Sequence, residues 1–326
     1  MTAGSGGDPG AGADPRTTVV VLSHDRREGL LATLDRLAAL PERPPVVVVD
    51  NASTDGAPAA VARRHPRVTL VAAGGNTGAA GRTLGVRAAR TPYVAFSDDD
   101  SWWRPGALRR AADLLDAHDR LALLAARVTV EPGGAEDPVN AELAASPLGR
   151  AADLPGPRVL GFLACAAVAR REAFLAAGGY HPALFVGGEE TLLAYDLVAR
   201  GWGVCHCPEV EAVHRPAGGE RPGRRAVLRR NAVLTTWLRR PLGLAVRRTG
   251  VLLADARRDP AARAALGGLL VRLPVVLRDR RPLPPEAERL ARRLDPESAA
   301  APQRETAAPP RVAAAWRADT AEGDTP

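Results

Sequence analysis

The feature that most limits the fold of this chain is a set of short apolar runs, rich in valine, that alternate with helical patterns. The first two runs cover residues 17–22 and 46–49, and neither alternates with polar side chains. Such strands are typically buried on both faces, as in a parallel sheet covered by helices. Leucines at helical spacing between residues 28 and 40 predict the connecting helix.

The same alternation continues along the chain. Residues 57–64 form a short helical pattern, residues 68–71 predict a third strand, and residues 93–96 predict a fourth. The order strand, helix, strand, helix, strand favours an α/β fold with a Rossmann-like, mostly parallel sheet flanked by helices. Ligands of such sheets bind beyond the carboxyl ends of the strands, so the residues that follow each strand predict the site.

The four segments that follow the predicted strands are all polar or rich in glycine. They are residues 23–26, 50–56, 74–82 and 97–100. Because parallel strands end at the same edge of a sheet, we expect the four segments to meet. The sequence therefore predicts one ligand site built from four strand ends.

The aspartate triplet, Asp98, Asp99 and Asp100, is the sharpest of these signals. Three adjacent carboxylates repel one another unless a cation lies between them. Mg²⁺ or Mn²⁺ prefers oxygen ligands and could also neutralise a diphosphate. The alternative is a solvated acidic turn before the helix predicted to begin near Pro105.

The glycine-rich segment 74–81 would let the backbone approach a phosphate or a sugar closely. It is followed by Arg82, which could pair with phosphate charge. No Gly-Lys-Ser/Thr follows the glycines, so the segment is not a P-loop, and its spacing does not fit the dinucleotide-binding fingerprint. By itself the segment could also be a flexible loop.

Together these motifs resemble the family-2 glycosyltransferases, which are inverting enzymes of the GT-A fold. The resemblance rests on VVDNASTDG at 48–56, GNTGAAGR at 75–82 and YVAFSDDD at 93–100. A fourth block, between residues 178 and 214, is similar to the acceptor side of the family. The similarity covers about residues 17–216 and implies transfer of a sugar from a nucleoside-diphosphate donor, assisted by Mg²⁺ or Mn²⁺.

The resemblance also implies roles for particular residues. Asp100 would be the principal metal ligand, His214 a second ligand to metal or diphosphate, and Glu190 the catalytic base that takes the acceptor proton. The residues expected to contact the donor, with Asn51 at the base and Asp99 at ribose or diphosphate, are Ser23, Asp25, Asp50, Asn51, Asn76, Gly78, Arg82, Asp98 and Asp99.

The acceptor block departs from the family at three positions. Glu190 stands where the family more often has aspartate, Leu192 where a second carboxylate is common, and Asp196 where arginine is common. The choice between Glu189 and Glu190 as base stays open, because acidic residues also complement the N-terminus of a helix. Trp102 and Trp103 could stack on a ring or anchor the next helix.

Charge divides the chain. The sequence has 44 basic residues, all arginine, against 37 acidic ones, for a net charge of +7. We expect a flexible tail at 1–16, a GT-A domain at 17–218, a basic helical extension at 219–296 and a second disordered tail at 297–326. The arginines could attract phosphate, nucleic acid or anionic lipid, or could reflect a biased composition. We expect the extension to dock on a membrane face or to assemble a homodimer.

The compartment is inferred from cysteines and hydropathy. Cys165, Cys205 and Cys207 give no disulfide framework, and the last two could complete no zinc site. The N-terminus has no signal-peptide pattern, and the apolar stretch 265–277 is interrupted by arginine and proline. We therefore expect a cytoplasmic enzyme, with peripheral contact at the inner face of the plasma membrane left open.

The predicted acceptor is a hydroxyl group of a cell-surface polysaccharide, a glycolipid or a similar lipid-linked glycan, and nucleic acid is not an expected partner. Two alternatives remain at this stage: a sugar nucleotidyltransferase, and a non-enzymatic protein that binds nucleic acid or a membrane surface. The first would need a basic, glycine-rich loop after the first strand, which residues 23–26 do not provide.

In the second half of the chain, residues 131–157 are predicted as a long loop, and residues 160–168 and 203–207 are predicted as strands.

Overall fold

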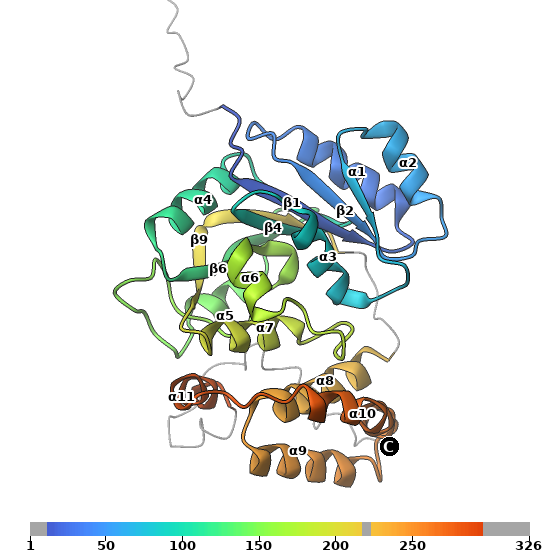
Figure 1. Ribbon diagram of the computed structural model, residues 1–326, viewed down its shortest axis with the longest axis vertical. Helices are drawn as coiled ribbons and strands as arrows, with labels where there is room; N and C mark the ends of the chain where they lie inside the picture. The colour runs from blue at the N-terminus through green and yellow to red at the C-terminus, as the bar shows by residue number, and fades with distance from the viewer. Residues whose placement is uncertain (1–11, 217–222, 296–326) are drawn as a thin grey trace, which may run out of the picture.

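The computed structural model describes residues 12–216 and 223–295, and its centre is one mixed sheet (Figure 1). In its parallel half, β1 pairs with both β2 and β4, and β2 pairs with β3. The bounds are Thr17–Ser23 for β1, Val46–Asp50 for β2, Thr69–Ala72 for β3 and Tyr93–Asp98 for β4. The valine runs thus form the parallel strands that the sequence predicts.

The other half of the sheet is mixed. The order across the sheet is β3-β2-β1-β4-β8-β6-β9-β5, with β6 parallel to β9 and β8 antiparallel to its neighbours. A two-residue strand, β7, pairs with β6. The bounds are Ser101–Trp103 for β5, Leu121–Val130 for β6, Ala135–Glu136 for β7, Ala167–Arg170 for β8 and Gly203–His214 for β9.

Helices cover both faces of the sheet, as the uninterrupted valine runs require. Val19 and Val21 pack on the side of α1, α2 and α4, whereas Val20 packs on the side of α3, α6 and α7. The bounds are Arg27–Ala38 for α1, Ala57–Arg64 for α2, Gly81–Ala88 for α3, Ala107–Ala117 for α4, Val139–Ala144 for α5, Arg171–Ala177 for α6 and Glu189–Val198 for α7.

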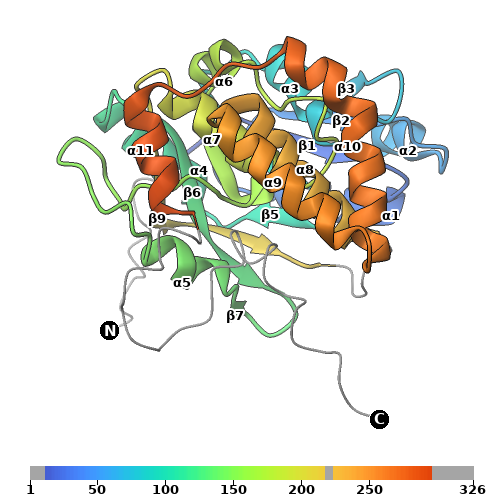
Figure 2. The same cartoon turned by 90° about the horizontal axis from the view of Figure 1, so that it is seen from below.

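Four C-terminal helices form a further layer next to α7 (Figures 1 and 2). They are α8 at Arg224–Arg239, α9 at Leu242–Asp255, α10 at Pro260–Arg278 and α11 at Pro285–Arg293. A third apolar cluster joins this layer to the rest of the fold, because Leu192 of α7 packs with Val233 and Leu234 of α8. The C-terminal extension is therefore helical, as expected, and its helix α8 packs against α7, the helix that begins with Glu189.

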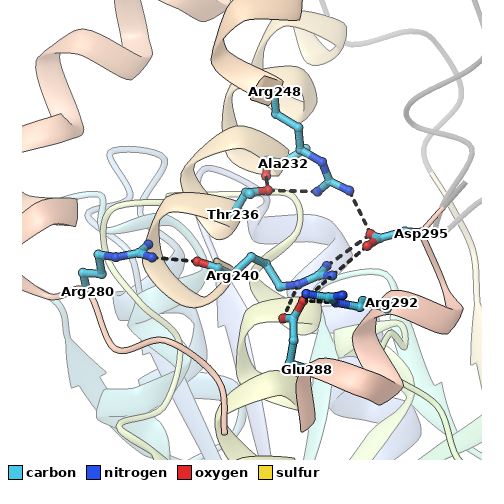
Figure 3. A network of polar contacts seen from close by, with 8 residues as sticks. All are labelled: Ala232, Thr236, Arg240, Arg248, Arg280, Glu288, Arg292 and Asp295. Carbon is cyan, nitrogen blue, oxygen red and sulfur yellow. Dashed lines mark hydrogen bonds and ion pairs between the residues drawn. The ribbon is translucent and has the colours of Figure 1, made fainter. Parts of the chain in front are cut away.

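Buried arginine pairs fix this layer in place, as Figure 3 shows. Arg240 is 1% exposed and pairs with Glu288 at 2.8 Å and with Asp295 at 2.6 Å. Arg248 reaches the same Asp295 carboxylate at 2.8 Å, and Arg292 reaches Glu288 at 2.9 Å. Several of the basic side chains are thus structural and hold α8, α9 and α11 together.

Several predicted boundaries were wrong. The strand predicted to stop at residue 207 continues through Pro208 to His214, because a bulge opposite Ala126 and Arg127 removes Pro208 from the hydrogen-bond ladder. The strand predicted at 160–168 begins only at Ala167, and the predicted loop 131–157 contains β7 and α5. β5, which no sequence pattern indicated, is held by its pairing with β9.

The tails and the boundary near residue 218 lie mostly outside the described residues. At the end of the predicted first tail, however, Asp14 donates its backbone N–H to the Glu42 carbonyl, and Arg16 forms ion pairs with Asp14, Asp113 and Asp116. The ordered domain therefore begins before residue 17.

α10 continues through Pro274, although Arg272 and this proline were expected to break the apolar stretch. Among the described residues, α10 is long and apolar enough to span a membrane by length and composition alone, with a mean hydropathy of 1.4. Only 22% of that segment is buried in the protein, so it is not a core helix of the usual kind.

Candidate functional site

The aspartate triplet lies at the carboxyl end of β4, beside the end of β1, as predicted. Asp99 accepts a hydrogen bond from Ser23 Oγ at 3.1 Å. Arg26 lies between two carboxylates, with its Nε 3.4 Å from Asp99 Oδ1 and its Nη2 3.4 Å from Asp100 Oδ2. Burial raises the pKa of Asp99 to about 7, although Arg26 opposes this shift. The neighbouring carboxylates Asp100 and Asp98 add to the rise.

His214 reaches the triplet from the far end of β9. Its Nε2 lies 3.5 Å from Asp100 Oδ1, because β5 and β9 pair with Ser101 opposite His214. The backbone N–H of Arg215 donates to the Asp100 carbonyl at 2.8 Å and fixes the strand end there. Burial disfavours the charged imidazole, but the hydrogen bond and charge of Asp100 outweigh it and raise the pKa of His214.

Asp100 and His214 fit a divalent ion that is shared with a substrate. Within residues 12–216 and 223–295, no three histidine, cysteine or acidic side chains are grouped so as to hold a metal by themselves. One or two carboxylates usually suffice for Mg²⁺ bound with a nucleotide, because phosphate oxygens and water complete the shell. Asp100 supplies such a carboxylate, and the His214 imidazole could add a ligand or contact the diphosphate. The donor set therefore fits Mg²⁺ or Mn²⁺ bound together with a diphosphate.

Asn51 binds the glycine-rich segment rather than standing free. Its Nδ2 donates to Asn76 Oδ1 at 3.0 Å and to the Gly78 carbonyl at 3.2 Å, and its Oδ1 accepts the Thr77 N–H at 2.9 Å. The side chain is 3% exposed. Asn51 and Asn76 therefore shape the segment, and direct contact of Asn51 with a base stays a prediction.

Asp25 and Asp50 shape the loop that follows β2. Asp25 Oδ1 accepts the Thr54 N–H at 2.6 Å, and this hydrogen bond is the main reason that the pKa of Asp25 is lowered. Asp50 Oδ1 accepts the Ser53 N–H at 3.3 Å. Both aspartates lie at the predicted edge of the sheet, and each is engaged with the backbone there.

Gly78 permits a close contact between the glycine-rich segment and residues 184–188. A Cβ atom at this position would lie 2.2 Å from the Phe185 carbonyl oxygen, and the φ of Gly78 is +59°. The N–H of Ala79 donates to the same carbonyl at 2.6 Å. The glycine-rich segment and the loop that leads to Glu189 are therefore in direct contact.

Arg82, which directly follows the glycine-rich segment, is buried. Its guanidinium pairs with Asp98, and its charge also acts on Glu189 and Glu190. Its Nε has no hydrogen-bond partner among the described residues. Arg82 thus joins the aspartate triplet to the acidic start of α7, while its predicted contact with phosphate stays untested.

The two glutamates at the start of α7 differ in exposure. Glu189 is 4% exposed, whereas Glu190 is half-buried. Burial, followed by repulsion from Glu189, raises the pKa of Glu190 to about 8. A carboxylate with a raised pKa is suited to accept a proton near neutral pH. Glu190 is the more exposed of the two and stays the predicted base.

α8 holds the loop that leads to α7, a contact that no sequence pattern indicated. Asn231 is 1% exposed, and its Nδ2 donates to the carbonyls of Leu184, Val186 and Gly187 at 2.9, 2.9 and 2.6 Å. Further along the helix, Arg239 pairs with Asp196 of α7 at 2.5 Å. Asp196, which departs from the family pattern, is thus a buried anchor for α7.

The remaining candidates are structural. Trp102 is 7% exposed and has the Arg36 guanidinium 3.9 Å from its ring centroid, and Trp103 is 1% exposed. Both tryptophans therefore anchor the fold rather than stack on a ligand. Cys165, Cys205 and Cys207 are free and buried, and the predicted absence of a disulfide framework agrees with this.

Residues 18–176 match the family described as "Glycosyl transferase family 2". The chain is 29% identical to the N-acetylglucosaminyl-diphospho-decaprenol L-rhamnosyltransferase of Mycobacterium tuberculosis, over 61% of this chain and 76% of that protein. It is 38% identical to the succinoglycan biosynthesis protein ExoO of Rhizobium meliloti, but this match covers 32% of the chain and only 30% of ExoO.

Among solved structures, the chain is similar to the mannosyltransferase PcManGT of Pyrobaculum calidifontis, determined with GDP-Man and Mn²⁺. The TM-score is 0.56 at 23% identity, and the match covers 91% of this chain and 78% of that one. At this identity the likeness shows the fold alone. The mixed sheet flanked by helices is thus confirmed as the predicted GT-A fold.

Proposed function

From the match of residues 18–176 to glycosyl transferase family 2, we propose that the chain transfers a sugar from a nucleoside-diphosphate donor to a hydroxyl acceptor of a cell-surface glycan. The observation that carries the proposal is the approach of His214 to Asp100, 3.5 Å apart at the end of β4. This pair lies at the same sheet edge as the glycine-rich segment 74–81, and Arg82 pairs with the neighbouring Asp98 while its charge acts on Glu190.

Asp100 and His214 would hold Mg²⁺ or Mn²⁺, which would neutralise charge on the departing nucleoside diphosphate. Ser23 and Arg26 hold Asp99 beside this position. Glu190 would take the proton of the acceptor hydroxyl as the oxygen attacks the anomeric carbon. A single displacement inverts that carbon, so no residue needs to form a covalent bond to the sugar.

Relatives support the choice of donor and acceptor. PcManGT was determined with GDP-Man and Mn²⁺, which supports a nucleotide-sugar donor and a divalent ion for this chain. The Mycobacterium tuberculosis relative is named after a decaprenol-linked acceptor, which supports a lipid-linked glycan as the acceptor of this chain. A cytoplasmic location at the inner face of the membrane fits such an acceptor, and both this location and a homodimer stay predictions.

A panel of nucleoside diphosphates tests the proposal. We expect the unfolding midpoint to rise with one of them in the presence of Mn²⁺, and to rise much less without the ion, because the ion and the diphosphate share their ligands. A stabilisation of about 2.7 kcal/mol is expected at a nucleotide concentration 100 times its Kd. If no nucleoside diphosphate shifts the midpoint with any divalent ion, donor binding is contradicted.

Asn231→Ala tests the support that α8 gives to the base. The loop 184–187 would lose the donor that three of its carbonyls share, at a cost of about 1–3 kcal/mol in stability. We expect kcat to fall while the KM for the donor changes little, because α7 carries the base and not the metal ligands.

Asn140→Ala is the matched control, since Asn140 is also buried and donates to the Val128 carbonyl at 2.8 Å. It should lose similar stability without the loss of kcat. Equal kinetic effects in the two variants would mean that Asn231 serves stability alone.

A further inference from the structure

The large apolar side chains that stay exposed are concentrated on two helices. Phe185 and Val186 lie elsewhere, and every other such side chain in the described residues belongs to α9 or α10. We refer to these residues as the apolar face: Leu242, Val246, Val251, Leu253, Leu270, Val271, Val275 and Leu277. Figure 2 shows α9 and α10 next to each other on the side of the molecule that is turned toward the viewer.

Helical spacing places most of the apolar face on the outer sides of the two helices. In α9, Leu242, Val246 and Leu253 recur at one turn or whole multiples of it, and they are 54–55% exposed. In α10, Leu270 is 59% exposed and Val271 is 77% exposed. A helix at a water-facing surface normally presents polar residues on its outer side, so this arrangement requires another explanation.

The buried sides of α9 and α10 already pack into the protein. Leu252 of α9 and Ala262, Ala265 and Leu269 of α10 belong to the third apolar cluster, together with Leu234 of α8. The apolar face is therefore additional to the apolar surface that the fold needs. Both helices are thus apolar on two sides: one side packs into the protein, and the other side is left to pack against something else.

The charge of this layer is concentrated and positive. Residues 223–295 contain eighteen arginines and six acidic residues, a net charge of +12, whereas the whole chain carries +7. Arg263 and Arg278 lie seven positions from Leu270 and Val271, respectively, and so project from the same side of α10. Arg257 and Arg258 are exposed just before α10 and, among the described residues, have no acidic partner.

We propose that the apolar face docks on an anionic lipid bilayer, with the arginines at both ends of α10 contacting lipid phosphates. Phosphate groups complement a net charge of +12, whereas a second copy of the chain would bring an equal positive charge against it. The arginine stems can extend over apolar surface while their charged ends reach the phosphates. The apolar face would then be the surface that holds the protein at the membrane location proposed above, and its docking does not depend on sugar transfer.

Flotation of the full chain with lipid vesicles tests the proposal without any activity measurement. We expect binding to vesicles of equal parts phosphatidylglycerol and phosphatidylcholine, weak binding to phosphatidylcholine alone, and a decline as salt is raised. The triple variant Arg257→Gln, Arg258→Gln, Arg263→Gln is expected to bind on the order of 100-fold more weakly. The variant Leu253→Ser, Leu270→Ser, Val271→Ser keeps the charge and is expected to lose about tenfold or more.

The matched control is Arg63→Gln, Arg67→Gln, Arg90→Gln, which removes the same charge from exposed positions of the catalytic domain. It should retain binding. Equal losses in the two arginine variants would overturn the proposal, because net charge alone would then explain binding. It would also be overturned if the serine variant converted a dimer to a monomer by light scattering while vesicle binding stayed unchanged. Mn²⁺-dependent nucleotide binding is measured in the same variants and should stay unchanged. The sugar-transfer proposal is thereby tested separately from membrane docking.

Discussion

Replacing Glu190 with glutamine is expected to lower kcat by about 10²–10⁴, with donor binding retained, because the amide cannot take the acceptor proton. The substitution preserves the size of a half-buried side chain at the start of α7. Initial rates with the identified donor and acceptor give kcat, and the nucleotide-induced thermal shift reports donor binding. A variant with kcat within twofold of the wild type would exclude Glu190 as the base.

The pH dependence provides a second readout of the same residue. Only the deprotonated carboxylate can act as base, and the pKa of Glu190 is raised from its ordinary value of 4.5 to about 8. The rate should therefore rise as the pH increases through about 8. The contribution of this carboxyl to the free energy of unfolding changes in the opposite sense, because the folded protein binds its proton more tightly than the unfolded chain does. The contribution is present in full below pH 4.5 and is lost as the pH rises through about 8.

Glu189→Gln is the matched variant, because repulsion from Glu189 is the second cause of the raised pKa of Glu190. Removing that charge should move the rise in activity to lower pH while leaving the maximal rate largely intact. If Glu189→Gln removes activity and Glu190→Gln does not, the roles of the two residues are exchanged.

Replacing Asp100 with asparagine is the second large effect. Loss of a neighbour that only orients a metal ligand typically costs 10–100-fold in metal affinity or activity, so loss of the carboxylate ligand itself should cost more than about 100-fold in kcat/KM. The Mn²⁺-dependent part of the nucleotide thermal shift should disappear. The pKa of His214 should also fall, since Asp100 is the main group that raises it.

The fold should tolerate this change, because Asp98 keeps Arg82 and Asp99 keeps Arg26 as partners. Asp119→Asn is the control, as Asp119 is exposed in the connection between α4 and β6. It removes an equal charge and should leave both rate and thermal shift unchanged. Metal-dependent donor binding that persists in Asp100→Asn would contradict the assignment of Asp100 as the principal ligand.

Local patterns predicted much of the site. The valine runs and the helix at 57–64 form as expected, and the aspartate triplet lies at the end of β4. By contrast, the sequence did not reveal that Arg26 lies between Asp99 and Asp100, or that Asn51 is occupied by the segment around Gly78. These contacts join segments that are distant in sequence, and arginine or asparagine in a loop carries no local signal for its partner.

The sequence by itself determined the order of strands and helices, the edge of the sheet that carries the polar segments, and the family that those motifs resemble. It could do so because apolar spacing and short motifs act over a few residues. Only the tertiary structure decided that β9 passes Pro208 to bring His214 to Asp100, that α8 supports the start of α7, and that α9 and α10 leave an apolar face uncovered. Each of these depends on how distant segments pack, and packing is settled by the whole chain at once.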